Sequence, residues 1–505
     1  MDYQAQAMKI IAVPLLGSLL IPVLGWMGRK KLTGYLAVAL IATTNIMTWK
    51  LIGPGLRGEN SHHLYPLFQG LGITLNFGLN IDALAIFMAF TASLIATLIA
   101  IYSLGYIEHE EHEPEYYFIV TLFVGGMMGL VFSTNLIFLY LFWEISALAT
   151  WRLIGYYREP EYVWKADKAF LITFAGAVLM LLGFGLVFAQ YGSFDLVGPG
   201  SLAGKPISAI ALILIMAGIF SKSATVPLHT WIPDAGVAPS TITSLLHAAI
   251  LVKIGLYGFA RMFLNGMVIP DKYWVWILGF AMASAFISAC AALMETNIKR
   301  MLAYSTVSQI GYTFLGFAAV ASWGYVGAIL YIMAHGLAKG GLFLCAGIVE
   351  HGTHTKDMTK MGGLIKKMPI TAIAYGVCAL SIAGIPPLAG FFSKYFVITG
   401  LLQGGYPIIA TLAILTAVLT LLYMLKSFHL VFLGQPRGES HHEGSPIMVG
   451  VVAVLAVLTI VVGLGLQVPW NLASKADQQR LELAGQAVQQ REALAAQVIQ
   501  ISSQP

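Results

Sequence analysis

The feature that most constrains this chain is a series of about fourteen apolar segments, each roughly 18 residues long or longer. A helix of about 20 apolar residues crosses the hydrocarbon core of a bilayer. The segments cover residues 8–27, 33–52, 82–107, 116–134, 135–157, 168–191, 207–229, 240–264, 273–294, 301–321, 324–350, 368–402, 406–433 and 447–467. They show no strand-like alternation, so the sequence predicts an all-α polytopic membrane protein rather than a barrel.

The scarcity of charge supports this class. Only 10% of the 505 residues are charged and 58% are hydrophobic, whereas about a quarter of an average soluble domain is charged. This composition excludes an ordinary soluble enzyme, a nucleic-acid binder and a disordered scaffold. We expect lipid around the bundle and no nucleic acid as a partner.

The basic residues outside the segments indicate the topology. Loops after odd-numbered segments hold more Lys and Arg than the termini and the even-numbered loops. In this count Lys299 falls in an odd loop and Arg261 in an even one. Because short basic loops stay in the cytoplasm, we expect a multi-pass protein of the cytoplasmic membrane with both termini on the other side. The first segment spans and is not a cleavable signal.

Five charged residues lie inside the predicted helices, namely Glu144, Lys222, Lys253, Lys339 and Lys394. Insertion scales assign roughly 2.5–3.5 kcal/mol to each such charge, or roughly 12–18 kcal/mol for all five. They must therefore face the bundle interior, pair with each other, or contact water. One carboxylate cannot neutralise four lysines. We therefore interpret the set as a proton relay, since burial makes a lysine easier to deprotonate.

Two histidines extend this series. His247 shares a segment with Lys253, and His335 lies four residues before Lys339, on the same helix face. Imidazole titrates near neutral pH, which suits it to passing protons. A buried histidine that only hydrogen-bonds a neighbour is the alternative.

Two of the lysines lie beside expected helix breaks. Lys222 precedes Pro227 and His229, and Lys394 follows Pro386 and Pro387. Proline removes a backbone donor and kinks a helix. Broken helices at membrane depth often line ion sites, although a packing kink is the alternative. We expect the seventh and twelfth helices to be broken.

An internal repeat follows from the spacing. Ser-Lys recurs at residues 222 and 394, and Thr-Asn recurs at 135 and 297. A unit of five helices fits both spacings, and an odd number of helices inverts the second copy. We divide the chain into N-terminal helices (1–115), a first repeat (116–264), a second repeat (273–433), a last helix (434–470) and an amphipathic tail (471–505). The tail is expected to lie on the membrane or a partner, or to be solvated.

Other signals are weaker. Cys290, Cys345 and Cys378 stand singly, which disfavours disulfides and an iron–sulfur site. His109, His112, His351, His354 and His441-His442 are interpreted as loop residues, so no metal or other cofactor is expected. No phosphate loop or dinucleotide fingerprint is present. Arg152, Asp167 and Lys168 either orient Glu144 or anchor the membrane interface.

Three stretches resemble a known family: VPLHTWIPDAGVAPSTITSLLHAAILVKIGLYGFAR, ETNIKRMLAYSTVSQIGY and SIAGIPPLAGFFSKYF. They are similar to the antiporter-like subunits of complex I, Mrp antiporters and membrane-bound hydrogenases, over roughly residues 80–435. The resemblance implies a 14-helix fold, membership of a larger complex, and proton-carrying roles for Glu144, Lys222, Lys253, His335, Lys339 and Lys394. His247 together with Lys253, and the chain length, look more like the Mrp and hydrogenase types.

Three functions remain open. The first is a proton-translocating subunit of a redox-driven membrane complex, with or without coupling to sodium and without a catalytic redox site of its own. The second is a subunit of an Mrp-type sodium/proton antiporter without a redox partner. The third is a structural scaffold, which the five buried charges disfavour. Other membrane subunits and protons or sodium ions are the expected partners.

Overall fold

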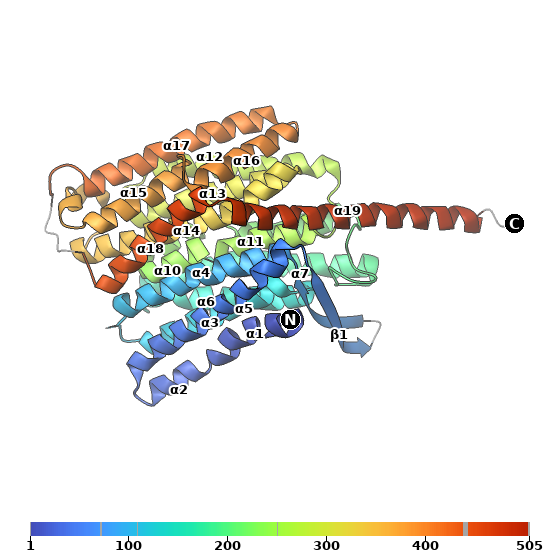
Figure 1. Ribbon diagram of the computed structural model, residues 1–505, viewed down its shortest axis with the longest axis horizontal. Coiled ribbons are helices and arrows are strands. Elements are labelled where there is room, and N and C mark those ends of the chain that lie inside the picture. The colour runs from blue at the N-terminus through green and yellow to red at the C-terminus, as the bar shows by residue number, and fades with distance from the viewer. Residues whose placement is uncertain (1, 71–72, 109, 250, 438–442, 503–505) are drawn as a thin grey trace.

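The computed structural model describes residues 2–70, 73–108, 110–249, 251–437 and 443–502, with side chains described through residue 486 except at 73 and 74. It is a bundle of long, roughly parallel and antiparallel helices (Figure 1). Within the described residues, eleven helices are long and apolar enough to cross a membrane. Each predicted segment corresponds to one helix or to a run of consecutive helical elements, which confirms the helical polytopic class.

The uninterrupted helices are α3 (Lys30–Leu56), α4 (Ala83–Tyr106), α5 (Glu113–Phe132), α6 (Leu136–Ile154), α7 (Pro160–Tyr191), α12 (Trp274–Met294), α13 (Ile298–Ala318), α14 (Ser322–Thr353), α17 (Pro407–Phe432) and α18 (Pro446–Leu464). The first predicted segment is a pair, α1 (Tyr3–Gly17) and α2 (Leu20–Trp26). Short 3₁₀ turns lie in the connections: η1 (Ala235–Val237), η4 (Asp271–Tyr273), η5 (Met358–Lys360) and η6 (Leu364–Lys366).

The two predicted breaks are present. The seventh segment is α8 (Ala209–Lys222), a non-helical stretch, and the short α9 (Trp231–Asp234). The twelfth is α15 (Pro369–Ala383) followed, after five residues, by α16 (Ala389–Gln403). In the twelfth segment Gly384 ends α15 with φ of +88°, in the left-handed region that favours glycine. At both breaks side chains supply partners to the backbone, since Val226 N donates to Ser284 Oγ and the Ile382 carbonyl accepts from Lys394.

The eighth segment is more irregular than the sequence predicts. It consists of α10 (Ser240–Ser244), a π-helical turn η2 (Leu245–Ala249), α11 (Leu251–Phe259) and a second π-helical turn η3 (Ala260–Leu264). π-Helical turns widen the helix and are frequent at functional sites. No pattern of glycine or proline in the segment predicts these π-helical turns.

A β-hairpin departs from the all-helical prediction. Strands β1 (Ser61–Gly70) and β2 (Ile73–Ile81) pair antiparallel, with an irregularity between Pro66 and Phe68. The hairpin contacts the bundle through an isolated bridge between Leu79 and Ser133. β1 carries consecutive apolar residues and a proline instead of an alternating pattern, so periodicity does not reveal it.

The internal repeat is visible in backbone hydrogen bonds that recur 162 residues apart. Leu136 N donates to Phe194 O at 3.0 Å, and Ile298 N donates to Lys356 O at 2.9 Å. Leu196 N donates to Thr134 O at 2.8 Å, and Met358 N to Thr296 O at 2.9 Å. In both copies an asparagine, Asn135 or Asn297, caps the first of these helices with its side-chain oxygen. Helices α6 and α7 therefore correspond to α13 and α14.

The second copy is inverted because five chain crossings separate the starts of α6 and α13. The two lysines beside the breaks do not occupy corresponding positions of the two repeats. Lys222 is the last residue of α8, before its break, whereas Lys394 lies in α16, after its break. This explains why the lysines are 172 residues apart while the scaffold repeats at 162.

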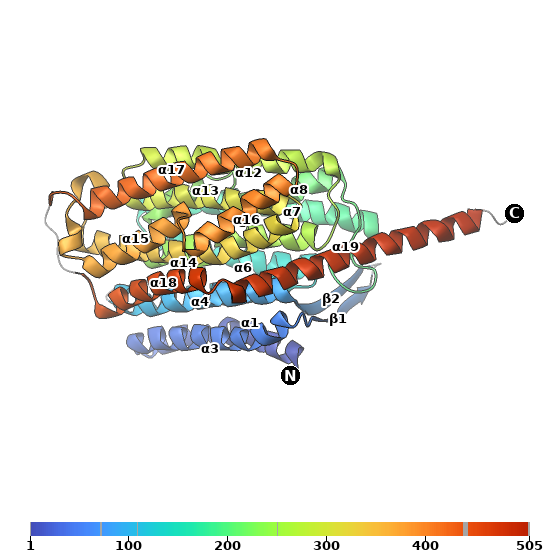
Figure 2. The same cartoon turned by 45° about the horizontal axis from the view of Figure 1, so that its top comes forward.

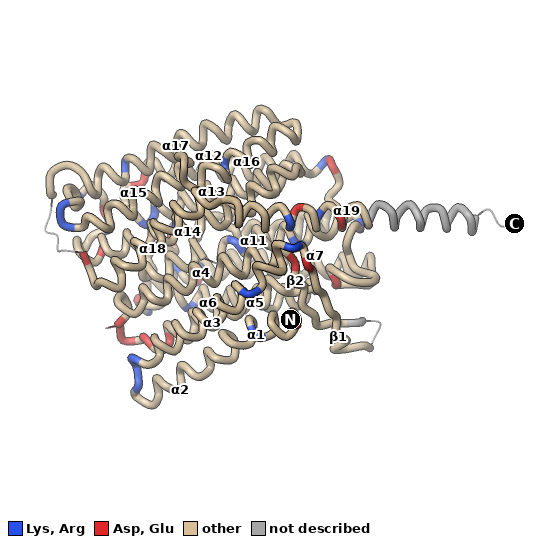
Figure 3. The backbone as a smooth tube through the Cα atoms, in the orientation of Figure 1, with Lys and Arg blue, Asp and Glu red and all other residues tan. Residues whose placement is uncertain are grey.

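Both chain ends lie at the hairpin end of the bundle (Figures 1 and 2). The Gln4 side chain donates to Ser61 and to the Leu79 carbonyl, which ties α1 to the hairpin. The tail is one helix, α19 (Gln467–Ser502). Its first turns pack on the bundle, where Gln479 accepts a hydrogen bond from Ala83 N, and the helix then continues past the bundle. Acidic and basic residues gather toward the two ends of the helices (Figure 3).

Candidate functional site

Glu144 and Lys222 form the first part of the candidate site. Lys222 is fully buried at the end of α8, and its ammonium nitrogen donates to the Trp143 carbonyl of α6 at 3.3 Å. It also lies 5.7 Å from the centre of the Trp143 ring. Glu144 is half-buried, its Oε1 has no hydrogen-bond partner among the described residues, and Lys222 is the cation acting on it. The two are electrostatic neighbours without a direct ion pair within 4.0 Å.

Lys253 lies in α11, just after the first π-helical turn. Its nitrogen donates to the His247 carbonyl at 3.0 Å and also to the Ala248 carbonyl. The lysine thus donates to two consecutive carbonyls of the π-helical turn. Gly336 of α14 permits this approach, since a β-carbon there would lie 3.1 Å from the Ala248 oxygen.

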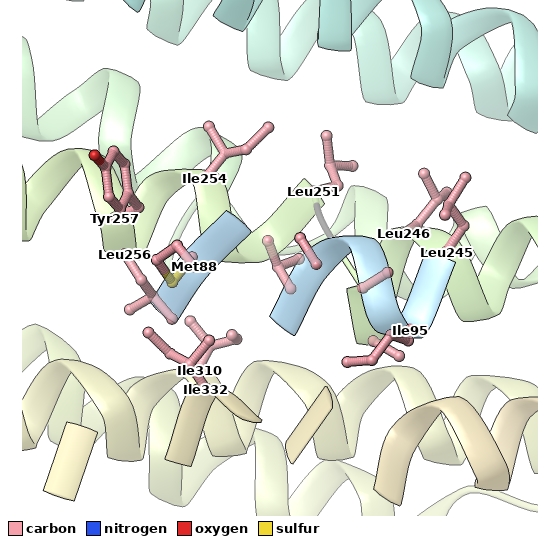
Figure 4. Close-up of a cluster of buried hydrophobic side chains, with 14 of the residues drawn as sticks. Met88, Ile95, Leu245, Leu246, Leu251, Ile254, Leu256, Tyr257, Ile310 and Ile332 are labelled. Atoms are coloured by element: carbon pink, nitrogen blue, oxygen red, sulfur yellow. The ribbon is translucent and has the colours of Figure 1, made fainter. Parts of the chain in front are cut away.

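Apolar side chains surround this irregular stretch (Figure 4). Met88 and Ile95 come from α4, Ile310 from α13 and Ile332 from α14, and all four are buried. They give this side of the turn an apolar environment. The charge on Lys253 therefore interacts strongly with other buried charges, because little solvent screens it.

His335 and Lys339 lie on α14, whose span is entirely buried. Lys339 donates to the Leu302 carbonyl of α13 at 2.9 Å. His335 interacts electrostatically with Lys253, Lys339, His247 and Lys394. The central helix α14 thus connects the eighth segment to the twelfth.

Lys394 reaches back across the break in its own segment. It donates to the Ile382 carbonyl of α15 at 2.7 Å, and its nitrogen lies 4.6 Å from the ring centre of Tyr312 and 5.8 Å from that of Tyr331. Aromatic faces attract cations. Gly384 leaves room for the lysine stem, because a β-carbon there would lie 3.2 Å from Lys394 Cδ.

The four membrane lysines share one property. Each is buried and donates to a backbone carbonyl, and none forms an ion pair within 4.0 Å with a carboxylate of the described residues. Sequence reasoning allowed pairing as a solution, and the structure uses carbonyls instead. A carbonyl accepts a hydrogen bond from an ammonium and from a neutral amine alike. The lysine can therefore lose or gain a proton without losing its contact.

The buried histidines have open hydrogen-bonding capacity. Both ring nitrogens of His247 and of His335 lack partners among the described residues, although both histidines are buried. A neutral imidazole has one donor and one acceptor, and buried polar groups are normally satisfied. Such places are where ordered water bridges polar groups. His229, between α8 and α9, is half-buried, and its Nδ1 likewise has no partner in the described part of the chain.

The secondary residues anchor helices at the periphery. Arg152 pairs with Glu115 of α5 and not with Glu144. Asp167 accepts a hydrogen bond from the Trp151 indole at 2.8 Å, and Lys168 pairs with Asp234 at 2.6 Å. Pro227, Pro386 and Pro387 lie in the two breaks, as expected. His109 and His441-His442 lie outside the described residues.

Sequence reasoning missed two ion pairs with buried cations, because it assigned those cations to loops. Arg261 lies in η3 and pairs with Asp82 through two nitrogens, one of them at 2.8 Å. Lys299 of α13 pairs with Glu350 of α14 at 2.6 Å, and its side chain is 2% exposed. Both cations lie at the ends of segments, where their sequence position looks like that of a loop residue.

The described residues contain no group of three or more His, Cys, Asp or Glu that could hold a metal ion. The arrangement instead offers titratable side chains, breaks and backbone carbonyls inside a bundle with an inverted repeat. This combination defines a polytopic membrane protein of the inverted-repeat transporter class.

Comparison with known proteins gives the family. The model described as NADH:quinone oxidoreductase/Mrp antiporter, TM matches residues 133–420. A second model, NADH-Ubiquinone oxidoreductase (complex I), chain 5 N-terminus, matches residues 68–117. The first match covers more than half of the chain, so the chain belongs to the NADH:quinone oxidoreductase/Mrp antiporter membrane family. The resemblance seen in the sequence motifs is confirmed.

Two curated relatives illustrate the similarity, and both are Na(+)/H(+) antiporter subunits. The relative from Alkalihalophilus pseudofirmus is 34% identical over 485 residues, and the one from Staphylococcus haemolyticus is 32% identical over 487 residues. The alignments cover 89% and 90% of this chain but 60% of each relative. The chain thus spans about three-fifths of the length of these relatives.

A solved structure shares the fold. A chain in the structure of the Mrp complex from Dietzia sp. DQ12-45-1b superimposes with a TM-score of 0.85 at 23% sequence identity. The match covers 96% of this chain and 98% of that one. At this identity the comparison establishes the architecture.

Proposed function

We propose that this chain is an ion-translocating subunit of a multisubunit membrane complex, and that protons pass through Glu144, Lys222, Lys253, His335, Lys339 and Lys394. One observation carries the proposal: four buried lysines donate to backbone carbonyls and lack carboxylate partners within 4.0 Å among the described residues. Leaving four charges in this state is costly for a bundle that gains nothing from them. A series of groups that change protonation explains why they are present.

The proposed order follows the electrostatic neighbours, except that the step from Lys222 to Lys253 follows the packing of α8 against α11. Glu144 and Lys222 form the input half, and Lys253 is the central link. His335 and Lys339 connect this link to Lys394, which leads to the outer exit. Protonation of one member disfavours the charged form of the next, since like charges repel strongly in a medium of low dielectric constant. A change at Glu144 would thereby travel through the bundle.

The names of the relatives favour a sodium/proton antiporter of the Mrp type, assembled with other membrane subunits. A redox-driven complex is the second candidate, because both family descriptions include NADH oxidoreductases. The subunits that copurify with the chain discriminate the two. A hydrogenase or quinone-reductase arm indicates the redox-driven complex, and only small membrane subunits indicate the antiporter.

We further propose that the chain lies in the cytoplasmic membrane with both termini on the non-cytoplasmic side. Fourteen crossings return the chain to the side on which it starts. The end of the bundle that carries Lys30, Lys31, Lys366 and Lys367 is then the cytoplasmic end, as the distribution of loop cations favours.

The decisive test replaces the two lysines at the helix breaks. In vesicles that contain the complete complex, Lys222→Ala and Lys394→Ala are each expected to abolish proton translocation while the complex still assembles. Lys205→Ala is the control, because Lys205 lies in the connection between α7 and α8 and donates to the Gly200 carbonyl of the same connection. Wild-type translocation in either break variant overturns the relay.

A further inference from the structure

The Lys299–Glu350 ion pair lies at the end of the bundle that we propose faces the cytoplasm. Glu350, near the end of α14, accepts contacts from two lysines on different oxygens. Lys356 lies 3.2 Å from Oε1, and Lys299 lies 2.6 Å from Oε2. The exposure of these side chains falls from 30% for Lys356 to 21% for Glu350 and 2% for Lys299. The cluster therefore leads from the surface into the protein.

A line of polar side chains continues inward from Glu350 along the eighth segment. Ser240 Oγ donates to Glu350 Oε2 at 3.4 Å, and Ser244 Oγ donates to the Gly340 carbonyl of α14 at 3.4 Å. His247 follows, with both ring nitrogens unpartnered among the described residues, and it interacts electrostatically with Lys339 and Lys253. Ser240 and Ser244 are four residues apart on α10 and share one helix face, and His247 follows in the π-helical turn η2. All three side chains are completely buried.

The internal repeat shows that the fold does not require these charges. In the first copy, 162 positions earlier, apolar residues replace all three charged ones. Ile137 corresponds to Lys299, Phe188 to Glu350 and Phe194 to Lys356. Phe188 and Phe194 stack with ring centres 4.5 Å apart. At the opposite end of the bundle, the same backbone arrangement is thus closed by apolar side chains. The charged cluster is specific to the second copy.

We propose that Glu350 is the mouth of a second cytoplasmic entry to the ion path, in addition to the input half at Glu144 and Lys222, and delivers protons along Ser240, Ser244 and His247 to Lys339. This inference rests on the relay proposed above. A proton from surface water protonates the Glu350 carboxylate, and rotation of the carboxyl group turns the O–H toward Ser240. The Ser240 hydroxyl accepts this proton as it releases its own to an intervening water, and the same exchange repeats at Ser244. Consecutive serines are one turn apart, about 6 Å along the axis, which leaves room for one water molecule between them.

The two lysines make the mouth a gate. Lys299 and Lys356 keep the carboxylate ionised at rest, so Glu350 takes up a proton only when one lysine moves aside or gives up its own proton. Glu350 also interacts electrostatically with three tyrosines: Tyr102 and Tyr106 of α4, and Tyr157 after α6. Phenols are neutral near pH 7. The lysines are therefore the groups that control the gate.

Two measurements on the complete complex test the proposal. The first is proton translocation by Glu350→Gln, normalised to the amount of assembled complex, with Glu350→Asp as the conservative variant. We expect Glu350→Gln to lower the rate at least about tenfold, at the low end of what a positioned proton carrier contributes. Glu350→Asp should restore much of the rate, and the dependence of the rate on cytoplasmic-side pH should change in Glu350→Gln.

The second measurement is water access from the cytoplasmic side. In a background without Cys290, Cys345 and Cys378, Ser244→Cys should react with a small, membrane-impermeant cationic thiol reagent added on that side. The matched control is Ile242→Cys, a completely buried apolar position on the same helix that should stay unreactive.

Wild-type translocation in Glu350→Gln, or a Ser244→Cys as unreactive as Ile242→Cys, overturns the proposal. Lys222→Ala in the same preparation separates this failure from failure of the relay. If Lys222→Ala abolishes translocation and Glu350→Gln does not, the relay stands and only the mouth is wrong. If Lys222→Ala translocates normally, the relay itself is wrong, and the thiol reaction still reports on the mouth.

Discussion

The two five-helix repeats share a backbone frame but differ in their ionisable groups. Helices α6 and α13 begin with the same asparagine cap, and α7 and α14 end in the same left-handed turn, at Gly192 and His354. The side chains that face the interior are different. The position of Glu144 in the first repeat is occupied by Thr306 in the second.

The reverse holds on the next helix. Positions 335 and 339 carry His and Lys in the second repeat, whereas the corresponding residues of the first are Thr173 and Ala177. The acid therefore lies on the first helix of one pair and the bases lie on the second helix of the other. The two repeats are similar scaffolds, and in the proposed ion path they supply different chemical groups.

The largest effect is expected from giving the first repeat the residue of the second. Glu144→Thr removes the carboxylate that acts on Lys222, and we expect proton translocation to fall by about 100-fold or more, in the range typical of a lost proton carrier. Thr306→Ala is the matched variant, because the Thr306 hydroxyl donates to the Leu302 carbonyl of its own helix. It should retain most of the wild-type rate. Equal losses in the two variants, measured in vesicles per assembled complex, would show that the difference between the repeats has no functional meaning.

A smaller effect is expected from the opposite exchange in the second repeat. His335→Thr introduces the residue that the same scaffold already accommodates at Thr173, so the complex should assemble. Translocation should fall about tenfold, because His335 connects Lys253 to Lys394 but water in its place can carry part of the flow. Thr173→Ala, at the corresponding position, should have little effect. A His335→Thr complex that assembles and translocates at the wild-type rate would exclude His335 from the path.

Much of the architecture could be predicted from the sequence, for a simple physical reason. A helix that crosses a bilayer needs a long apolar run, and composition alone reveals such a run. The breaks were predictable because Pro227, Pro386 and Pro387 remove backbone donors. The hairpin was not, since β1 lacks alternation, and the π-helical turn at His247 was not, since no residue type encodes it. Both depend on packing against distant parts of the chain.

The candidate residues in the middle of the bundle could be selected from the sequence, and the charged residues at its ends could not. A charge inside an apolar run is conspicuous, so Glu144 and Lys253 stood out. Lys299 and Glu350 lie at the ends of such runs, where charged residues are ordinary. Only the packing of α13 against α14 shows that the two form an ion pair in which Lys299 is buried. Glu350 became a candidate only through comparison with Phe188 at the corresponding position of the first repeat. That comparison requires the 162-residue offset, which the backbone hydrogen bonds establish.

The smallest effect is expected from the asparagine caps that recur in the two repeats, and it tests whether the repeats are structurally equivalent. Asn135→Ala and Asn297→Ala each remove a helix cap, which costs about 1 kcal/mol of stability. Asn135 has a second role, because its side-chain nitrogen also donates to the Asp195 carboxylate at 2.7 Å. Asn135→Ala should therefore be the more destabilising variant, by about 1 kcal/mol more, since a buried carboxylate loses one of its donors. Thermal unfolding of the detergent-purified complex measures the difference.

If only one of the two variants lowers the unfolding temperature, the two caps are not equivalent, and the two repeats are less alike than their backbone hydrogen bonds indicate. If both lower it and translocation by the folded complex is unchanged, the repeated elements serve the scaffold, and the ion path depends on the residues in which the repeats differ.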